Sequence, residues 1–406
     1  MKSMINSIDL KNINFYLILL IPVSMVAGNL ILNFNIIVID ILGLYLIYKN
    51  KNKIKIDPSL KILFILFVYI VSTSLLSNYP IYSFTKAIFY FKFFIFTFVL
   101  IYIFELNREY LRAFYISLII CLFIVSFDGL LQRYSGENIF GWSLYNNRMT
   151  GLFKDEAVVG SYLSKFLFLG IGFFYIFEKN FNKNKIFEIF LILICFFTVI
   201  SSGERMATLH ILLGLVIYLI INLLNFKKNL IINLVILISC LFLLINNQIL
   251  KSRINETFEV RYGIGKSVRE FKDSQWGAHY LTSIEIFKEN LIFGSGFKTF
   301  RMECKKFDQI ESKKKELRCS THSHNYILEI LSETGILGLF LFLLFLYHLI
   351  SSINIRKKLS YIIMIPLLIY LWPIGTSGSL FSTFNGSFFF IIISIIIALK
   401  KEKIFI

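Results

Sequence analysis

Long runs of uncharged, hydrophobic residues recur along this chain and limit what it can fold into. About twelve runs are present, each roughly 15–22 residues long. That is the length needed to cross a hydrocarbon core about 30 Å thick as a helix rising about 1.5 Å per residue. The sequence therefore predicts an all-α polytopic membrane protein with about 12 transmembrane helices. The runs are 13–32, 34–48, 61–77, 86–104, 113–131, 156–177, 186–201, 206–224, 230–245, 334–351, 360–374 and 386–399.

The lysines and arginines between the runs predict how the chain is oriented. If the N-terminus is cytoplasmic, the inner segments carry twenty Lys and Arg residues, whereas the short outer segments 33–35, 78–85 and 375–385 carry none. Basic residues favour the cytoplasmic side in this way, so both termini are predicted to be cytoplasmic. Much of the net charge of +17 then reflects topology. No nucleic-acid partner is expected, because such a protein would concentrate its basic residues on one soluble module.

The runs divide the chain into three parts. Residues 1–245 are predicted to hold transmembrane helices 1–9, residues 246–333 a large outer loop, and residues 334–406 transmembrane helices 10–12. The loop carries fifteen Lys and Arg residues. Within it, the spacing of apolar residues from Trp276 to Asn290 predicts an amphipathic helix.

Two of the five cysteines lie outside the hydrophobic runs. Cys304 and Cys319 are separated by fourteen residues in the outer loop, and such a pair is expected to form a disulfide in an oxidising compartment. The alternatives are two free thiols, or a metal site that also uses His322 and His324. No metal is expected, because the sequence has neither a Cys-x-x-Cys nor a His-x-x-x-His spacing.

A motif of one histidine and two glycines stands where the outer loop returns to the membrane. His324-Asn325 is followed by nine residues and then Gly335-Ile-Leu-Gly338. This pattern resembles the signature of the O-antigen ligase and O-antigen polymerase superfamily. Three further segments resemble the family in the expected order, and the likeness covers about residues 120–350. These segments are Arg148-Met-Thr-Gly151-Leu-Phe153, Ser201-Ser-Gly-Glu-Arg205 and Leu291-Ile-Phe-Gly294-Ser-Gly296-Phe297.

The chain departs from the family pattern at two places. Asp155-Glu156 stands where Pro-Asn often follows the first arginine element, and Glu204 stands where small residues are usual. The flanking hydrophobic runs match the family only in their number.

The resemblance implies a fold like that of the C-type glycosyltransferases and an enzyme of the bacterial inner membrane. Such enzymes take a glycan from undecaprenyl diphosphate at the periplasmic face and transfer it to an acceptor sugar. The acceptor is lipid A-core for a ligase and another glycan repeat unit for a polymerase, and membrane lipids surround the protein. The lipid diphosphate supplies the energy, so no nucleotide cofactor is expected. In agreement, the sequence has no Gly-rich phosphate loop with a lysine.

Arg205 is the candidate for stabilising the departing diphosphate. A guanidinium stays cationic and binds phosphate in a bidentate fork, which suits a leaving group that gains negative charge. Arg205 follows the serine-rich turn at the outer end of a predicted helix. The alternative is that Arg205 pairs with Glu204 or reaches the phosphate of a membrane lipid.

Four more basic residues are candidate substrate ligands. Arg148 belongs to the first arginine element, and Arg269 and Arg301 lie in the large outer loop. Lys92 lies within a hydrophobic run, where a charged side chain usually faces a cavity or another charge. Lys92 is therefore interpreted as either a diphosphate ligand or half of a structural ion pair.

His324 is the candidate general base. The acceptor hydroxyl is a weak nucleophile at neutral pH, and histidine is the residue type whose pKa lies near that pH. The alternatives are that His324 is a hydrogen-bonded structural residue at the start of a helix, or that His322 is the base. Asn325 and Glu329 are candidates for orienting His324 or the acceptor sugar.

A second class of function is a polysaccharide transporter or flippase. Many transporters are built from two related halves, whereas this chain has no internal repeat and concentrates its polar residues in one outer loop. An enzyme with a single outward-facing site is therefore favoured. Within that class the ligase is favoured over the polymerase, because the His-Asn-x9-Gly-x-x-Gly pattern fits without gaps.

Overall fold

Helices and the loops between them make up the described part of the chain. The computed structural model describes residues 12–50, 56–177, 185–225, 230–255, 275–308, 319–351, 353 and 358–401. Seven helices in these residues are long and apolar enough to cross a membrane, so the chain is an all-α multi-pass membrane protein. The helices are α2 (Ile21–Ala27), α3 (Asn29–Asn50), α4 (Pro58–Ser74), α5 (Pro80–Leu106), α6 (Arg108–Ser135), η1 (Gly151–Phe153), α7 (Val159–Phe177), α8 (Lys185–Ser201), α9 (Arg205–Asn225), α10 (Leu230–Asn246), α11 (Gln248–Asn255), α13 (Gln275–Glu289), α14 (Phe300–Glu303), α15 (Lys305–Asp308), α16 (Tyr326–Ser351), α17 (Lys358–Tyr370) and α18 (Thr383–Lys401).

The hydrophobic runs all overlap helices, but not all of these helices reach membrane-spanning length. The seven candidate spans lie in α3, α5, α6, α7, α9, α16 and α18, while α4 and α10 contain shorter apolar helices. The number of crossings, twelve, therefore remains a prediction. The helix predicted over the first run, residues 13–32, is interrupted before its predicted end. Gly28 separates α2 from α3 because its φ of 115° cannot be accommodated in a helix.

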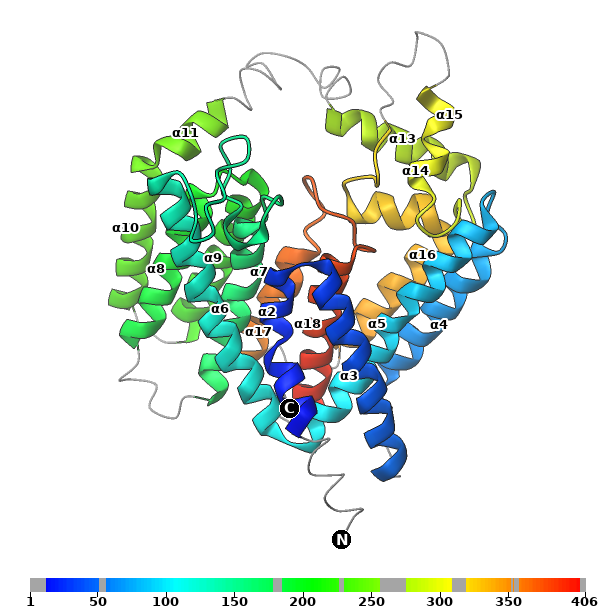
Figure 1. Cartoon of the computed structure of the whole chain (residues 1–406), viewed down its shortest axis with the longest axis horizontal. Coiled ribbons are helices and arrows are strands. Elements are labelled where there is room, and N and C mark those ends of the chain that lie inside the picture. The colour runs from blue at the N-terminus through cyan, green and yellow to red at the C-terminus, as the bar shows by residue number, and fades with distance from the viewer. Residues whose placement is uncertain are drawn as a thin grey trace.

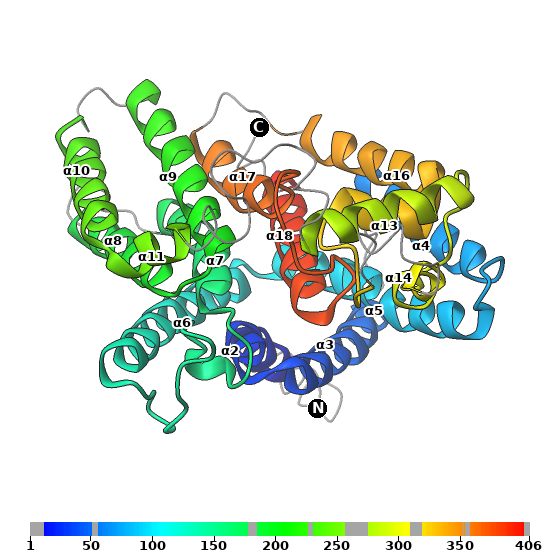
Figure 2. The same cartoon turned by 90° about the horizontal axis from the view of Figure 1, so that it is seen from above.

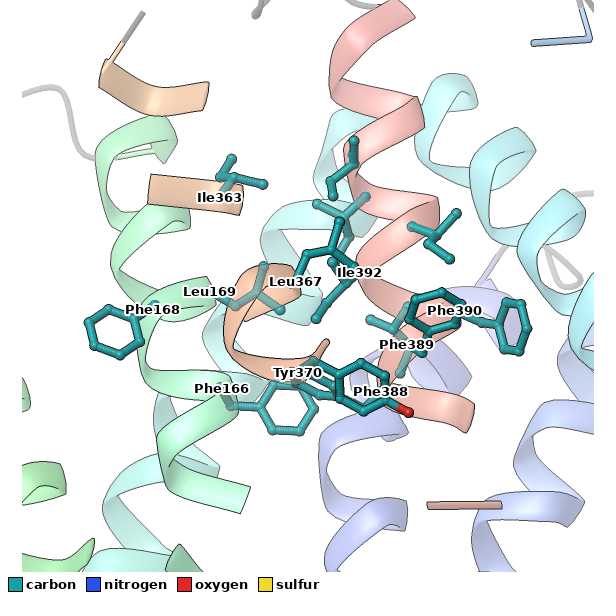
Figure 3. Packing of buried hydrophobic residues seen from close by; sticks show 14 of the residues in the cluster. Phe166, Phe168, Leu169, Ile363, Leu367, Tyr370, Phe388, Phe389, Phe390 and Ile392 are labelled. Atoms are coloured by element: carbon teal, nitrogen blue, oxygen red, sulfur yellow. The ribbon is translucent and has the colours of Figure 1, made fainter. Parts of the chain in front are cut away.

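Aromatic rings pack the centre of the bundle where α7, α17 and α18 meet (Figure 3). The ring centroids of Phe166 and Phe388 are 4.7 Å apart, and those of Tyr370 and Phe389 are 5.5 Å apart. Lipid tails are as apolar as these side chains, so close packing rather than exclusion from water fixes how the helices fit. The second turn of α18 is thereby held at a defined place in the bundle.

The two ends of the bundle carry different groups (Figure 1). Helices α11, α13, α14 and α15 and the loop between α17 and α18 gather at one end, called the loop end below. At the opposite end, Lys400 pairs with Asp57 at 2.8 Å and Lys401 pairs with Glu105 at 2.6 Å. The sequence predicts that these four residues lie on or border the cytoplasmic side. They do share one end, but which side that end faces remains a prediction.

The segment that leads back to the membrane is helical earlier than predicted. Figure 2 shows α13, which covers the segment predicted as an amphipathic helix, lying alongside α16. Helix α16 begins at Tyr326, whereas the sequence predicts that the outer loop extends to residue 333. The predicted boundary coincides instead with a break inside α16, where Gly335 has a φ of 69°. The Asn325 cap starts the helix before the hydrophobic run begins, and the boundary of the outer loop at 333 stays a prediction.

A disulfide joins the end of α14 to the segment that precedes α16. Cys304 and Cys319 are bonded, with their Cα atoms 5.1 Å apart. Cys304 is buried in a small core with Ile286 of α13 and Phe300 of α14. The bond therefore holds the start of the segment that carries the histidine motif next to α14.

We predict that protein purified without reductant contains the Cys304–Cys319 disulfide, because an outer loop would face an oxidising compartment. Closing a loop of this size contributes about 3 kcal/mol in the chain-entropy description, so reduction should lower the unfolding temperature. Mass spectrometry of alkylated peptides without reduction measures the bond. The three free cysteines, which are buried, serve as controls that react only after unfolding. Alkylation of Cys304 and Cys319 in the folded, unreduced protein would contradict the prediction.

Candidate active site

A contact between two glycine backbones fixes the loop end to α16. Gly294 has a φ of 72° and Gly335 a φ of 69°, a conformation that costs residues with a Cβ atom free energy. A Cβ atom on Gly294 would lie 2.4 Å from the backbone of Glu333, and one on Gly335 would lie 2.2 Å from the Ile292 carbonyl oxygen. The Gly-x-Gly element and the glycine of the histidine motif therefore pack backbone against backbone.

Glu333 holds the turn that follows the Gly-x-Gly element. Its side chain is 1% exposed, and its carboxylate accepts hydrogen bonds from the amides of Lys298 at 2.7 Å and Phe300 at 3.3 Å. The Gly296 amide donates to the Glu333 carbonyl at 3.1 Å. These bonds hold Lys298 at a φ of 58° and fix the turn from which Lys298 and Arg301 extend.

A polar cavity of about 350 Å³ lies beside this turn. Its wall combines segments from α3, α7, α16, the turn before α14, the loop before α16 and the loop between α17 and α18. A cavity of this composition can bind a ligand that carries both negative charge and hydroxyl groups. The charged lining residues are the cations Lys165, Lys298 and Arg301 and the carboxylates Glu156, Glu329 and Glu333.

Glu329 and Lys165 connect the cavity wall to the loop before α18. Glu329 is 2% exposed, and its carboxylate accepts hydrogen bonds from the Ser379 hydroxyl and from the Leu380 amide, the latter at 2.8 Å. Lys165, on α7, donates to the Asn385 side-chain oxygen at 3.0 Å. The predicted site residue Glu329 therefore lies in the cavity wall, where its hydrogen bonds hold the neighbouring loop.

His322 and His324 occupy different positions in the wall. His322 lines the cavity, and its Nε2 lies 3.4 Å from the Ser377 carbonyl oxygen. His324 lies behind it, with the two ring centroids 3.9 Å apart. The Nε2 atom of His324 is 3.1 Å from the Ser320 hydroxyl, and its ring packs edge-on against Trp276 at 4.9 Å.

Both imidazoles are neutral at physiological pH. Burial lowers the pKa of His322 to about 4 and that of His324 to about 3. The positive charge of His279 contributes to both shifts, and that of His322 contributes to the shift of His324. Negative charge bound in the cavity would oppose these effects and raise both pKa values.

Asn325 caps α16. Its side-chain oxygen accepts hydrogen bonds from the amides of Ile327 at 3.0 Å and Leu328 at 3.1 Å, which is the bonding of a helix N-cap. Its side-chain NH₂ donates to the Pro373 carbonyl at 2.9 Å. The structure thus gives Asn325 a structural role, and its role as a substrate ligand stays a prediction.

Arg148 and Arg205 lie together outside the cavity lining. The Met149 amide donates to the Ser202 carbonyl at 3.0 Å, and a Cβ atom on Gly203 would lie 3.5 Å from the Arg148 side chain. The first arginine element therefore packs on the serine-rich turn that leads into Arg205, the first residue of α9. The structure brings these two predicted residues to one place.

Glu204 connects this turn to the cavity. Its carboxylate accepts hydrogen bonds from the Gly160 amide at 2.5 Å and from the Ser161 hydroxyl at 2.7 Å, so it caps the start of α7. Ser161 in turn lines the cavity. Burial raises the pKa of Glu204 to about 7, although the hydrogen bonds from Ser161 and Gly160 oppose that rise. Glu204 thus joins the turn that carries Arg205 to a residue of the cavity wall.

One of the predicted substrate ligands, Lys92, lies elsewhere. Lys92, on α5, donates a hydrogen bond to the Asn33 side-chain oxygen on α3 and has Asp40 as a charged neighbour. It does not line the polar cavity, and Asp40 supplies a partner for the ion-pair interpretation. Arg269 lies outside the described residues.

The sequence did not single out three residues of the cavity. Lys165 lies in a hydrophobic run and carried the same signal as Lys92, a charge where apolar residues are expected. Lys298 directly follows the Gly-x-Gly element, and Glu333 is one of the nine residues between His324-Asn325 and Gly335. For Lys298 and Glu333, the feature of the sequence that could have indicated a role in the site was their position beside or within a family element.

A family model covers the part of the chain that contributes many of these residues. Residues 190–343 match a family model described as O-antigen ligase. The matched stretch contains His322, His324 and Arg205, and the cavity residues from Lys298 to Glu333. A search of curated proteins found no match. The matched stretch carries three of the four elements that resemble the family in sequence, so this part of the chain is similar to the O-antigen ligase family.

Proposed function

We propose that this protein is an O-antigen ligase-like glycosyltransferase that transfers a glycan from undecaprenyl diphosphate to a sugar hydroxyl of lipid A-core. The cavity carries the proposal, because it combines three cations, three carboxylates and a histidine at the loop end of a membrane protein. The cations suit a diphosphate, and the carboxylates and hydroxyls suit a sugar. The match of residues 190–343 to the O-antigen ligase family model supports the same class of reaction.

The proposed reaction is one displacement at the anomeric carbon of the donor glycan. An oxygen of the acceptor hydroxyl attacks that carbon while its bond to the phosphate oxygen breaks. Undecaprenyl diphosphate leaves with the electron pair, and the acceptor proton passes to a histidine. The two substrates supply every atom and electron, so the reaction balances without a further reactant.

The basic residues are proposed to stabilise the diphosphate as it leaves. Lys298 and Arg301 line the cavity and can face the ligand directly. Arg205, with Arg148 beside it, lies across Glu204 and Ser161 from the same cavity. Fixed cations of this kind stabilise charge that develops in the transition state without reorganising during the reaction.

His324 is proposed as the general base because of its place in the family motif. The observation that His322 lines the cavity supports His322 as a second candidate. The low pKa of each ring makes it a weak base in the absence of substrate. A bound diphosphate would raise the pKa of the base toward the working pH, where general-base catalysis is most effective.

The proposed location is the bacterial inner membrane, with the loop end in the periplasm and both termini in the cytoplasm. The bias of lysine and arginine between the hydrophobic runs supports this orientation. So does the shared position of Lys400, Lys401 and their acidic partners at the end opposite the cavity. The donor and the acceptor would then reach the cavity from the outer leaflet.

We predict that protein reconstituted in liposomes with the lipid-linked glycan and lipid A-core forms glycan-substituted lipid A-core and releases undecaprenyl diphosphate. His324→Ala should slow this transfer by roughly 10²–10⁴-fold, the usual contribution of a positioned base. Product mass and rate are measured by chromatography and mass spectrometry. His348→Ala, a change near the other end of α16, is the matched control and should leave the rate unchanged.

The alternatives give different results in the same assay. Transfer to a second repeat unit but not to lipid A-core would identify a polymerase. Near wild-type transfer by His324→Ala, with loss in His322→Ala, would assign the base to His322. Absence of any transfer by the folded wild-type protein would contradict the proposed function.

Arg205→Lys should lose most of the transfer activity although it keeps the positive charge. The loss is expected because an ammonium group cannot reproduce the bidentate fork of a guanidinium on phosphate. The rate is compared with that of Arg112→Lys, a half-exposed residue whose neighbour Glu109 lies on the same helix turn. Wild-type activity in Arg205→Lys would show that Arg205 serves topology or packing.

The thermal stability of the protein should fall from pH 7 to pH 5, in part through His322. Its pKa is about 4 in the fold and 6.5 when unperturbed, so the unfolded state binds more protons between these values and acid favours unfolding. The stability contributed by the neutral ring is present above about pH 6.5 and is lost as the pH falls toward 4. The unfolding temperature of His322→Gln should depend less on pH in this range. An equal dependence in both proteins would contradict the burial argument.

A further inference from the structure

An apolar groove lies on the lipid-facing side of the transmembrane helices. It is farther from the loop end than the polar cavity. Helices α3 and α4 both pack against α5 (Figure 2), and residues of all three line a depression of about 560 Å³. Phe89 in the groove is 70% exposed and Val68 is 43% exposed. Apart from Ser72 and Lys92, every lining residue is apolar. The groove therefore offers a surface for a hydrocarbon chain within the bilayer.

One face of α3 connects the cavity to the groove. Asn29 lines the cavity, Asn33 hydrogen-bonds to Lys92, and Ile37 lines the groove. These residues are spaced by four, so they lie one above the other on the same side of the helix. From the first to the last, the distance along the helix axis is about 12 Å. The lining changes from polar to apolar over that distance.

Lys92 marks the junction between the two regions. Its amine donates to Asn33, whose side chain lies 3.4 Å from the Thr383 hydroxyl. Thr383 stands between Ser382 and Phe384, both of which line the cavity. The charged neighbours of Lys92 are Asp40 on α3 and Lys298 of the cavity. A cation thus lies where an apolar channel meets a basic cavity.

We propose that this groove binds the polyprenyl chain of the lipid-linked donor, with its diphosphate in the cavity and Lys92 at the point where the two join. The proposal rests on the proposed function and adds the site of the lipid tail. A chain in the groove leaves one hydrocarbon environment for another, so packing rather than exclusion from water distinguishes it from bulk lipid. The groove would therefore align the donor, and its effect on the Michaelis constant should be modest.

Filling the groove should weaken the use of a long-chain donor and spare a short-chain one. We compare Val68→Trp in the groove with Val235→Trp on α10, which is a matched control because its side chain is 44% exposed. The donors carry the same glycan on an undecaprenyl diphosphate or on a two-isoprene diphosphate. Val68→Trp should raise the KM for the long-chain donor about 5–10-fold, corresponding to about 1–1.4 kcal/mol. It should leave the KM for the short-chain donor within about twofold, and the control should change neither.

Three kinetic outcomes would overturn the proposal. They are equal KM values in the two Trp variants, an equal rise for both donors in Val68→Trp, and a wild-type enzyme that does not distinguish the donors. The unfolding temperature of each variant shows whether the fold is retained. If the wild-type protein transfers glycan from neither donor, the proposed function fails and the binding measurement below decides the groove by itself.

The binding measurement uses a polyprenyl diphosphate that carries a photoreactive diazirine in its chain, with the wild-type protein in nanodiscs. Labelled peptides should come from residues 68–72 and 88–95, and unlabelled polyprenyl diphosphate should reduce the labelling. An equal concentration of phosphatidylglycerol should not. Labelling that phosphatidylglycerol reduces equally well would identify an ordinary membrane lipid as the occupant and overturn the proposal, as would labelling confined to other helices.

Discussion

The backbone contact between Gly294 and Gly335 is the constraint on which the rest of the site depends. Here the loop end touches a transmembrane helix at a distance that a single Cβ atom would prevent. The break that Gly335 introduces leaves a separate helical piece before it, which begins at Tyr326 and carries Glu329 and Glu333. These two carboxylates bind the turn before α14 and the loop before α18. The geometry of the cavity therefore depends on the positive φ that glycine allows at position 335.

The buried carboxylates mainly accept hydrogen bonds from neighbouring loops and so fix the conformation of those loops. Glu333 receives two backbone amides of the turn before α14, and Glu329 receives a hydroxyl and an amide from the loop before α18. Glu204 does the same for the start of α7. Buried carboxylates are stable when hydrogen bonds compensate their loss of hydration. The protein thus uses its acidic groups on its own loops and presents Lys298 and Arg301 to the cavity, an arrangement suited to an anionic ligand.

Much of the fold could be predicted from the sequence, because membrane spans depend on local composition. Every hydrophobic run overlaps a helix, while local features such as the positive φ of Gly28 and the Asn325 cap moved helix ends. The site was less accessible. The family motif ranked His324 above His322, but a spacing of two residues in a loop does not tell which of the two rings faces the cavity. Lys165 joins the site only because α7 and α18 pack together at Asn385, a contact between residues far apart in the chain.

A polar cavity above an apolar groove solves a problem that any enzyme of a lipid-linked substrate must meet. The reacting bond needs fixed charges and exclusion of water, whereas the lipid tail needs to remain in hydrocarbon. On α3 the change from Asn29 to Ile37 joins these two environments within two helix turns. At that boundary the Lys92 amine donates a hydrogen bond to Asn33 and has Asp40 as a charged neighbour. The same helix face can therefore hold a donor at its junction, with its diphosphate beside Lys298 and its tail in the bilayer.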